Sequence, residues 1–358
     1  MTKTYPFKNL AFQGGGVKTL AYQGALNVLE EQHIFDQIER VAGTSAGATV
    51  AMLLSFRLSA AETIDIFNTL DFSRVPAVRS AKDLNWQPPK LVEPQIDRLV
   101  SNLDGVKRLL YRYGWYASDR GYDWLHEVIA QYCKGNGRAT FADFRACDFR
   151  DLHVVVTNIS SQRTEIFNAD NTPNVAVADA LLISQSIPLF FEAVQFDGYN
   201  IGTGDYYGDG GVLNNFPIHI FDRPQFAEDN EWFVNGVNWQ TLGVRLFTPL
   251  DCPGTQRPIT NLASYMANLF GAMVDQQDAL FDTSQSDRWR TINISNCCVS
   301  LTDFSVRPGS DDPKYQKLVA AGEEAATHFL ANYEAPTPDQ LVKLKRIISH
   351  LWPLAREQ

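Results

Sequence analysis

Five residues, Gly43-Thr44-Ser45-Ala46-Gly47, combine a nucleophilic hydroxyl with the small neighbours that a sharp turn requires. They stand between residues 38–42, which we interpret as a strand, and an apolar run over 48–56, which we interpret as part of a helix that begins at Ala46. Such a turn crowds the positions two before and two after the serine, so Gly43 and Gly47 avoid a clash. The Ser45 hydroxyl then stands at a helix N-terminus, where unpaired N–H groups and the helix dipole stabilise negative charge. The pattern predicts a nucleophile elbow, and an ordinary tight turn is the alternative.

A second glycine cluster, residues 14–16, follows the predicted strand 8–12. A phosphate-binding loop is one interpretation, because Lys18 and Thr19 come next, but neither the Walker spacing nor the dinucleotide-binding spacing is present. Glycine has no Cβ, so the backbone N–H groups of such a segment can approach a substrate oxygen closely. We therefore predict an oxyanion hole whose donors are Gly14, Gly15, Gly16, Val17 and Ala46.

A serine nucleophile needs a base, and the later part of the chain offers two candidates. Asp209 precedes Gly210 and Gly211, so another group can approach its carboxylate closely, although Asp-Gly is also a common turn. His219 would suit a Ser-His-Asp triad. The residues taken singly leave both candidates open.

The elements that must position these groups alternate between strand and helix near the N-terminus, which favours a parallel sheet covered by helices. We predict one domain over residues 1–358, with a motif-bearing core at about 7–220, a mostly helical insertion at about 60–150 and a C-terminal helical elaboration at about 250–358. Further strands are expected at 152–157, 164–167 and 241–247, and helices at 18–31, 175–184, 261–282, 315–333 and 340–351.

Composition narrows the class of protein. Hydrophobic residues make up 45% of the 358 residues, which is enough for a substantial core. The formal net charge of −10 argues against a nucleic-acid partner and predicts weak attraction to anionic lipid. No apolar run is long enough to span a membrane and no signal peptide is recognisable, so we expect a cytoplasmic protein, or an effector exported without a cleavable signal.

Metal and disulfide sites are not expected. The five cysteines at 133, 147, 252, 297 and 298 have no metal-ligand spacing, and we interpret them as thiols in a reducing compartment. We expect no metal and no other cofactor, and hence activity that persists in chelator.

Taken together and in this order, the motifs resemble those of the patatin-like phospholipase family. Residues 12–18 resemble its oxyanion loop, residues 43–47 its nucleophile elbow, and residues 209–217 its Asp-Gly-Gly motif with the segment that follows. Residues 184–190 resemble the Ser-x-Pro-Phe segment that the family carries before the aspartate. The resemblance covers about residues 7–220.

The resemblance implies a three-layer α/β/α fold with a mostly parallel central sheet and a helical insertion. It also implies a Ser-Asp dyad without histidine, in which Ser45 is the nucleophile and Asp209 the base. The motif glycines are Gly43, Gly47, Gly210 and Gly211. Two residues depart from the pattern: Thr19 stands where many members have glycine, and Glu192 where many have proline. Either departure could alter the shape of the acyl pocket.

A dyad poses a physical problem, because an ordinary aspartate has a pKa of about 3.9 and is a poor base for a hydroxyl. We expect burial beside Tyr206 and Tyr207 to make the transfer feasible. For the acyl pocket we predict walls from Met52, Leu189 and Phe190, with further candidates at Leu269, Phe270 and Met273. Trp86, Trp115 and Trp124 are expected either to meet a lipid interface or to pin the insertion to the sheet.

Three function classes follow. The first is a lipid acyl hydrolase of the phospholipase A or lysophospholipase type, which cleaves fatty acyl esters through an acyl-enzyme on Ser45 and touches a membrane transiently. The second is a general carboxylesterase or thioesterase on soluble esters, and the third a non-catalytic lipid-binding protein of the same fold. Ser45, Asp209 and the full glycine loop together favour the first two. An activator is plausible, because a free phospholipase damages its own cell, but no motif identifies one.

Overall fold

The computed structural model describes residues 4–76, 103–227, 230–252 and 259–334. Within them, eight strands form one sheet with the order β12-β11-β1-β2-β4-β8-β7, and β5 pairs with β4. The five strands from β12 to β4 are parallel, whereas β5, β7 and β8 are antiparallel to their neighbours. The strands are β1 (Asn9–Phe12), β2 (Arg40–Thr44), β4 (Asp151–Asn158), β5 (Arg163–Phe167), β7 (Val194–Phe196), β8 (Asp205–Asp209), β11 (Thr241–Phe247) and β12 (Thr291–Ser295).

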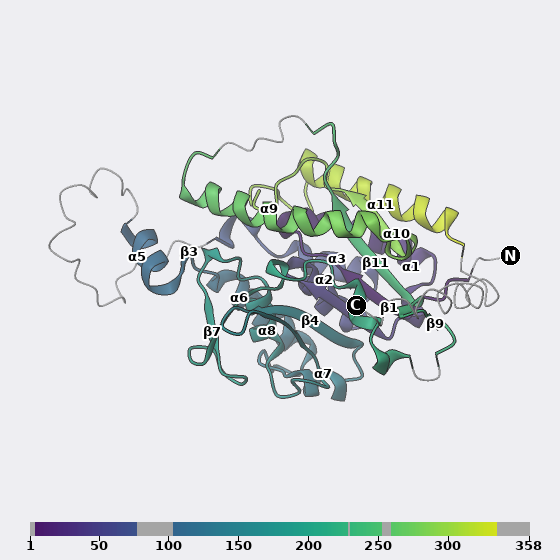
Figure 1. The fold of residues 1–358 in the computed structure, drawn as a ribbon, viewed down its shortest axis with the longest axis horizontal. Coiled ribbons are helices and arrows are strands. Elements are labelled where there is room, and N and C mark those ends of the chain that lie inside the picture. The colour runs from purple at the N-terminus through teal and green to yellow at the C-terminus, as the bar shows by residue number, and fades with distance from the viewer. Residues whose placement is uncertain (1–3, 77–102, 228–229, 253–258, 335–358) are drawn as a thin grey trace, which may run out of the picture.

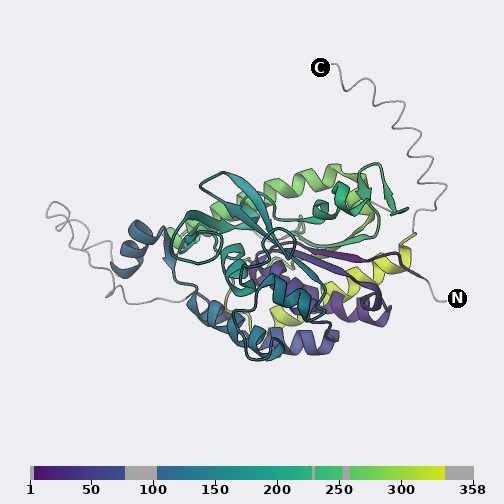
Figure 2. The ribbon, with the colours of Figure 1, turned by 90° about the horizontal axis from the view of Figure 1, so that it is seen from below.

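Helices cover both faces of this sheet, as the edge-on view in Figure 2 shows. One face carries the main hydrophobic core and packs against α1, α2, α8 and α11. The other face carries a smaller apolar cluster under the 3₁₀-helix Ile218–Phe221, with α9 on the same side (Figures 1 and 2). The helices are α1 (Tyr22–Glu31), α2 (Ala46–Ser55), α3 (Ala60–Asn68), α5 (Leu103–Arg112), α6 (Asp119–Tyr132), α7 (Phe141–Ala146), α8 (Val177–Ser184), α9 (Leu262–Thr283), α10 (Gln285–Trp289) and α11 (Pro313–Asn332).

The predicted three-layer α/β/α fold with a mostly parallel sheet is thus confirmed. The expected strands and helices are present with small shifts at their ends, except that the predicted helix 18–31 divides into a 3₁₀-helix, Gly16–Ala21, followed by α1. The predicted helix at 340–351 lies outside the described residues. Three sheet strands, β7, β8 and β12, were not expected. Strand β8 contains two Asp and one Gly, which are typical of loops, and β7 and β12 are only three and five residues long.

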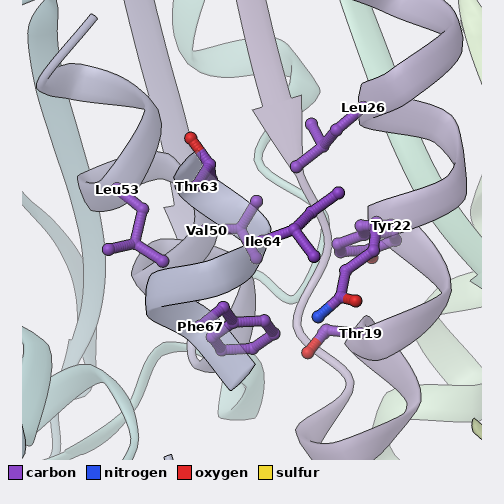
Figure 3. A pocket seen from close by; sticks show the side chains of 9 residues that line it. Thr19, Tyr22, Leu26, Val50, Leu53, Thr63, Ile64 and Phe67 are labelled. Carbon is purple, nitrogen blue, oxygen red and sulfur yellow. The ribbon is translucent and has the colours of Figure 1, made fainter. Parts of the chain in front are cut away.

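Tight packing joins the first three α-helices. Leu26 on α1, Val50 and Leu53 on α2 and Phe67 on α3 meet around a gap of only about 10 Å³ (Figure 3). A gap of this size holds at most one water molecule and no ligand. The helix that carries the residues after Ser45 is therefore held rigidly by its neighbours.

The predicted insertion contains the helices α3, α5, α6 and α7 and the strand β3 (Gly114–Tyr116), which pairs in parallel with β6 (Leu189–Phe191) outside the insertion. Trp124 on α6 is buried in the main hydrophobic core of the domain, and its indole N–H donates a hydrogen bond at 2.8 Å to the hydroxyl of Thr69, a residue of the insertion itself. It therefore pins the insertion to the body of the domain and is not available to a lipid interface. Trp86 lies outside the described residues.

Two cysteines correct the sequence interpretation. Cys252 and Cys298 form a disulfide across a separation of 46 residues, whereas Cys133, Cys147 and Cys297 are free. The bond ties the loop before α9 to the loop after β12. Neither cysteine has a spacing that signals the pair, because only the tertiary fold brings the two loops together.

Among the described helices, none combines the length and the apolar character that crossing a bilayer requires.

We predict that replacing both bonded cysteines by serine lowers the free energy of unfolding by about 4 kcal/mol. The loss follows from the larger conformational freedom that the unfolded chain gains when a loop of 46 residues is no longer closed. Urea unfolding, measured with and without reductant, tests this, with Cys147→Ser as the matched control. Equal denaturation midpoints for the wild type and the double variant would contradict the prediction.

Candidate active site

Ser45 lies between β2 and α2, at the turn that the sequence pattern predicts. Its backbone has φ 54° and ψ −130°, a conformation that is strained for a residue with a side chain. A Cβ at Gly43 would come within 2.3 Å of the Gly47 carbonyl oxygen, and one at Gly47 within 2.5 Å of the Gln13 carbonyl oxygen. Backbone atoms cannot yield that space, so both glycines are required by this turn.

The structure brings Ser45 and Asp209 together. The Ser45 hydroxyl donates a hydrogen bond to Asp209 Oδ2 at 2.7 Å, and the N–H of Gly211 donates one to Asp209 Oδ1 at 2.7 Å. Asp209 is the last residue of β8, and its antiparallel register with β4 places it opposite Val156. A hydroxyl and a carboxylate in this arrangement can exchange a proton without rearrangement.

Burial alters the acidity of this carboxylate. Asp209 has no exposed surface, and the loss of solvation raises its pKa from the ordinary value to about 7, although the hydrogen bonds from Ser45 and Gly211 oppose the rise. The expected neighbours Tyr206 and Tyr207 have other contacts. The Tyr206 ring packs edge-on against Tyr113, and the Tyr207 hydroxyl donates to Glu165 at 3.0 Å. The burial of Asp209 therefore does not depend on these two tyrosines alone. It arises from all the residues packed around the site, among them Phe270 beside Gly211.

Two serines from one short segment hold the pair in place. The Ser184 hydroxyl accepts a hydrogen bond from the backbone N–H of Ser45 at 2.8 Å and donates one to the carbonyl of Val155 at 2.7 Å. The carbonyl of Ser186 accepts a bond from the backbone N–H of Asp209 at 2.8 Å. The sequence pattern predicted a role for this segment, but its hydrogen bonds to both Ser45 and Asp209 appear only in the structure.

The glycine loop lies beside Ser45, and a cavity of about 20 Å³ separates them, lined in part by Gly15, Gly16 and Ser45. Gly14 and Val17 cannot act as predicted, because their N–H groups donate to the carbonyls of Asn215 and Leu301 at 3.0 and 3.1 Å. Within the described chain, the N–H groups of Gly15, Gly16 and Ala46 have no protein acceptor. Of the five predicted donors, these three N–H groups are therefore available to a substrate oxygen.

Gly16 shows why the loop needs glycine. Its φ of 54° favours glycine, and a Cβ there would meet the Leu301 carbonyl oxygen at 2.1 Å. The loop after β12 therefore presses directly on the donor segment.

Asn215 and Gln277 fasten the loop to the Asp209 motif. The Asn215 side-chain amide donates to the Gly14 carbonyl at 3.1 Å, and its backbone N–H donates to the Gln277 side chain at 2.9 Å. The Gln277 amide in turn donates to the Gly211 carbonyl at 2.8 Å. No sequence pattern indicated Gln277, which lies on α9 and is separated from Gly211 by 66 positions in the chain.

An apolar cavity of about 60 Å³ opens next to the Ser45 side chain. Its walls come from the glycine loop, α2, the insertion, β6 and the loop after β12, and they include Val17, Thr49, Phe72, Phe191, Leu301 and Phe304. The predicted acyl-pocket residues fit only in part. Met52 is fully buried in the main core and does not line this cavity, because Thr49, one turn earlier on α2, faces it. Phe190 packs behind the wall in the cluster that contains Phe191.

Leu189 lies elsewhere, half-exposed in a larger hollow of about 390 Å³ on the other side of the Ser186–Leu189 segment. Of the three α9 candidates, Phe270 borders the small cavity at the glycine loop, whereas Leu269 and Met273 are exposed to solvent. The pocket prediction failed for these residues because strand and helix orientation, which a lone sequence does not set, decides which neighbour faces the site.

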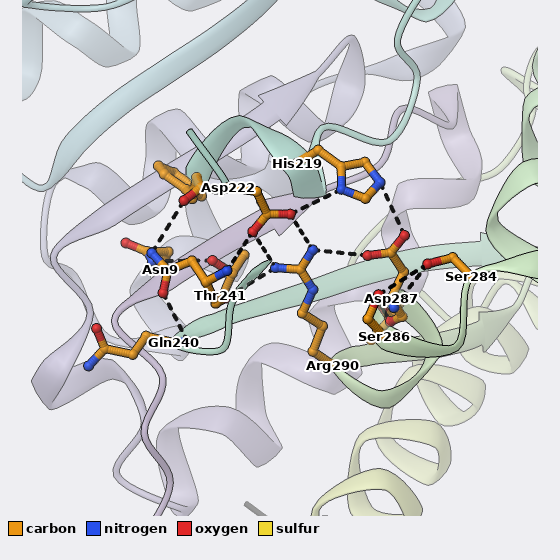
Figure 4. Close-up of polar contacts among 12 residues, drawn as sticks. Asn9, His219, Asp222, Gln240, Thr241, Ser284, Ser286, Asp287 and Arg290 are labelled. Atoms are coloured by element: carbon orange, nitrogen blue, oxygen red, sulfur yellow. Dashed lines mark hydrogen bonds and ion pairs between the residues drawn. The ribbon is translucent and has the colours of Figure 1, made fainter. Parts of the chain in front are cut away.

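His219 belongs to a separate polar cluster, shown in Figure 4. Its two ring nitrogens lie 3.0 Å from Asp222 and 3.1 Å from Asp287, and these carboxylates raise its pKa to about 9. Among the described residues, no histidine hydrogen-bonds Ser45. A histidine that is held protonated by two carboxylates is not available as a base near neutral pH.

The same three side chains lie close enough together to be considered as metal ligands. However, the guanidinium of buried Arg290 contacts Asp222 at 2.5 Å and Asp287 at 2.9 Å (Figure 4). The two carboxylates therefore already have cationic partners, and we interpret the cluster as an internal ion-pair network.

Comparison with known proteins agrees with this geometry. The model of the family described as patatin-like phospholipase matches residues 10–222, and the chain belongs to this family. It is 28% identical over 328 residues to the uncharacterized protein YqhO of Bacillus subtilis, covering 90% of this chain and 97% of that protein. It is 25% identical over 231 residues to the probable lipid hydrolase 463L of Invertebrate iridescent virus 6, covering 64% of this chain and 69% of that protein.

Among solved structures, VipD from Legionella pneumophila superposes with a TM-score of 0.50 at 18% identity, covering 92% of this chain and 67% of that one. At this identity the likeness shows the shared fold.

The buried carboxylate makes a prediction about stability. Because the folded-state pKa of Asp209 is about 7 and the unfolded value is 3.8, stability is lost as the pH rises through this window and the buried group ionises. We expect Asp209→Asn to raise the free energy of unfolding relative to wild type progressively from pH 4 to 7, by up to about 4 kcal/mol.

Urea unfolding at pH 4, 6 and 8 measures this difference. Asp65→Asn, at an exposed position on α3, is the control and should show no such trend. A pH-independent difference for Asp209→Asn would show that the buried charge is not the cause.

Proposed function

We propose that the protein is a lipid acyl hydrolase that cleaves fatty acyl esters through a Ser45–Asp209 dyad. The observation that carries the proposal is the 2.7 Å hydrogen bond from the Ser45 hydroxyl to a fully buried Asp209 carboxylate. Membership of the patatin-like phospholipase family supports the substrate class, as does the apolar wall of the cavity beside Ser45. The similarity to a probable lipid hydrolase agrees with it.

The proposed reaction has two steps. Asp209 takes the proton as Ser45 Oγ attacks the acyl carbonyl, and the negative charge develops on the carbonyl oxygen beside the N–H groups of Gly15, Gly16 and Ala46. The C–O bond to the alcohol then breaks, and Asp209 returns the proton to the leaving oxygen. In the second step Asp209 takes a proton from water, which attacks the acyl-enzyme, and the fatty acid departs as Ser45 recovers its proton.

The raised pKa serves this chemistry. A carboxylate with a pKa of about 7 accepts a proton far more readily than one at the ordinary value, yet it is still ionised in a large fraction of molecules at neutral pH. The 60 Å³ cavity is small, so a long acyl chain enters only after aromatic wall residues such as Phe72 or Phe304 move aside.

The cellular setting is also a proposal. The Cys252–Cys298 disulfide favours the exported alternative over the cytoplasmic one, because disulfides persist mainly in oxidising compartments.

We expect Ser45→Ala and Asp209→Asn each to lower hydrolysis of a phosphatidylcholine and of a short-chain nitrophenyl ester by about a thousandfold or more. His219→Ala should keep most of the activity, since its ring is engaged by two carboxylates away from Ser45. Initial rates measure the loss, and a fluorophosphonate probe should label wild type but not Ser45→Ala.

The contrary result, in which His219→Ala is inactive and folded while Asp209→Asn is active, would replace the dyad by a triad. Turnover of the short-chain ester without turnover of the phospholipid would instead favour a general esterase.

The rate should also depend on pH in a defined way. Asp209 must be ionised to act as the base, so activity should fall as the pH decreases through about 7, with the slope of a single proton. Rates between pH 5 and 9 on the short-chain ester test this, and His219→Ala should show the same profile. A midpoint near 9 that disappears in His219→Ala would assign the base to the histidine.

A further inference from the structure

One face of α9 exposes apolar side chains in a continuous row. Leu262, Tyr265, Leu269 and Met273 follow each other at spacings of three or four residues, which places them on the same side of a helix. Each side chain is 39–51% exposed. We call these four residues the α9 face.

The chain around the α9 face carries no charge. Residues 259–274 contain no Asp, Glu, Lys or Arg, although the protein as a whole has a formal net charge of −10. An exposed helix in a chain with this many charged residues would ordinarily present some of them to water. A partner with an apolar, uncharged surface therefore fits this region best.

The opposite face of the same helix forms part of the candidate active site. Ala267, Phe270 and Val274 pack in one cluster with Ile187, Phe191 and Leu301. The last three line the cavity beside Ser45, and Phe270 borders the glycine loop. The helix is therefore apolar toward the cavity on one side and apolar toward solvent on the other.

Two further apolar side chains are exposed on elements near α9. The helix packs against β6, where Leu189 is exposed, and Tyr113 is exposed immediately before β3, the partner of β6. Figure 1 shows the first half of α9, β3 and the end of α5 at the same end of the molecule.

We propose that the α9 face docks onto the surface of a neutral phospholipid bilayer and so brings the Ser45 cavity to its substrate. This inference rests on the proposed lipid acyl hydrolase function. Exposed apolar side chains on a surface helix are stabilised when they insert among the headgroups and upper acyl chains of a bilayer, and binding strength grows with the apolar area buried. Aromatic and aliphatic side chains, rather than basic ones, supply the attraction here, so the binding does not require anionic lipid.

The size of the α9 face argues against a second copy of the chain as its partner. Four side chains of about 200 Å² each, exposed by 39–51%, offer roughly 350 Å². A stable dimer interface buries about 800 Å² on each partner. A bilayer needs no complementary shape and accepts a small apolar patch.

The test uses the full chain with Ser45→Ala as background, so that the vesicles stay intact. Phosphatidylcholine vesicles are mixed with the protein and sedimented, and the bound fraction is measured at low and high salt. Leu262→Gln combined with Tyr265→Gln should reduce partitioning by about tenfold or more. Trp289→Gln, which removes an exposed apolar side chain from α10 beyond the other end of α9, is the matched control and should bind like the background protein.

Activity is measured in the protein that retains Ser45. There, the Leu262→Gln/Tyr265→Gln variant should keep its rate on the short-chain soluble ester, because neither side chain lines the cavities beside Ser45. Its rate on vesicles should fall in parallel with binding. The docking proposal is refuted if the double variant binds vesicles as well as the control does, or if vesicle binding weakens sharply as the salt concentration rises. It is also refuted if the substitutions change the oligomeric state, seen by light scattering, and leave vesicle binding intact.

The two proposals fail separately. In one outcome, vesicle binding requires Leu262 and Tyr265, but the protein with Ser45 intact hydrolyses no lipid. That outcome would support docking through the α9 face and refute the lipid hydrolase function. Hydrolysis of dispersed lysophosphatidylcholine by a protein that binds no vesicles would refute the docking face alone.

Discussion

The site depends on one buried hydrogen bond, from the Ser45 hydroxyl to the Asp209 carboxylate. Burial removes the solvent that would stabilise an ionised carboxylate, so it raises the free energy of the charged form. The same effect raises the pKa of Asp209 to about 7, toward the range that suits a general base. The fold therefore carries a destabilised group at the point where the proposed reaction needs a base. Compensation comes from the N–H of Gly211 and from the surrounding packing, which is dense enough to hold Ser45 in a strained backbone conformation.

Three separate parts of the chain make that bond geometrically necessary. Strand β2 pairs with residues 151–155 of β4, and β8 pairs with residues 156–158 along the same edge, because β5 occupies the opposite edge. The strand ends that carry Ser45 and Asp209 therefore meet next to each other on one side of β4. Ser184 and Ser186, at and just after the end of α8, then bind the backbone of Ser45 and of Asp209. Asn215 and Gln277 connect the glycine loop to the Asp209 motif. A shift in any of these elements would change the distance between the proton donor and its acceptor.

Helix α9 links the site to the surroundings of the molecule. Gln277 reaches inward to the carbonyl of Gly211, Phe270 borders the glycine loop, and the α9 face is exposed. The Cys252–Cys298 disulfide ties the approach to this helix to the loop that carries Leu301, whose carbonyl accepts the N–H of Val17. A short chain of covalent and hydrogen-bonded contacts therefore runs from the α9 region to the glycine loop.

The sequence by itself determined the fold class, the elbow at Ser45 and the pairing partner Asp209, because glycine spacing reports local backbone geometry and ordered motifs report family membership. Only the tertiary structure decided which side chains face the cavity, so that Thr49 lines it and Met52 does not. The tertiary structure also decided that the N–H groups of Gly14 and Val17 donate hydrogen bonds to the carbonyls of Asn215 and Leu301. It likewise decided that Cys252 forms a disulfide with Cys298. These features depend on contacts between segments far apart in the chain, and a local pattern of residues carries no information about which distant atom will arrive beside it.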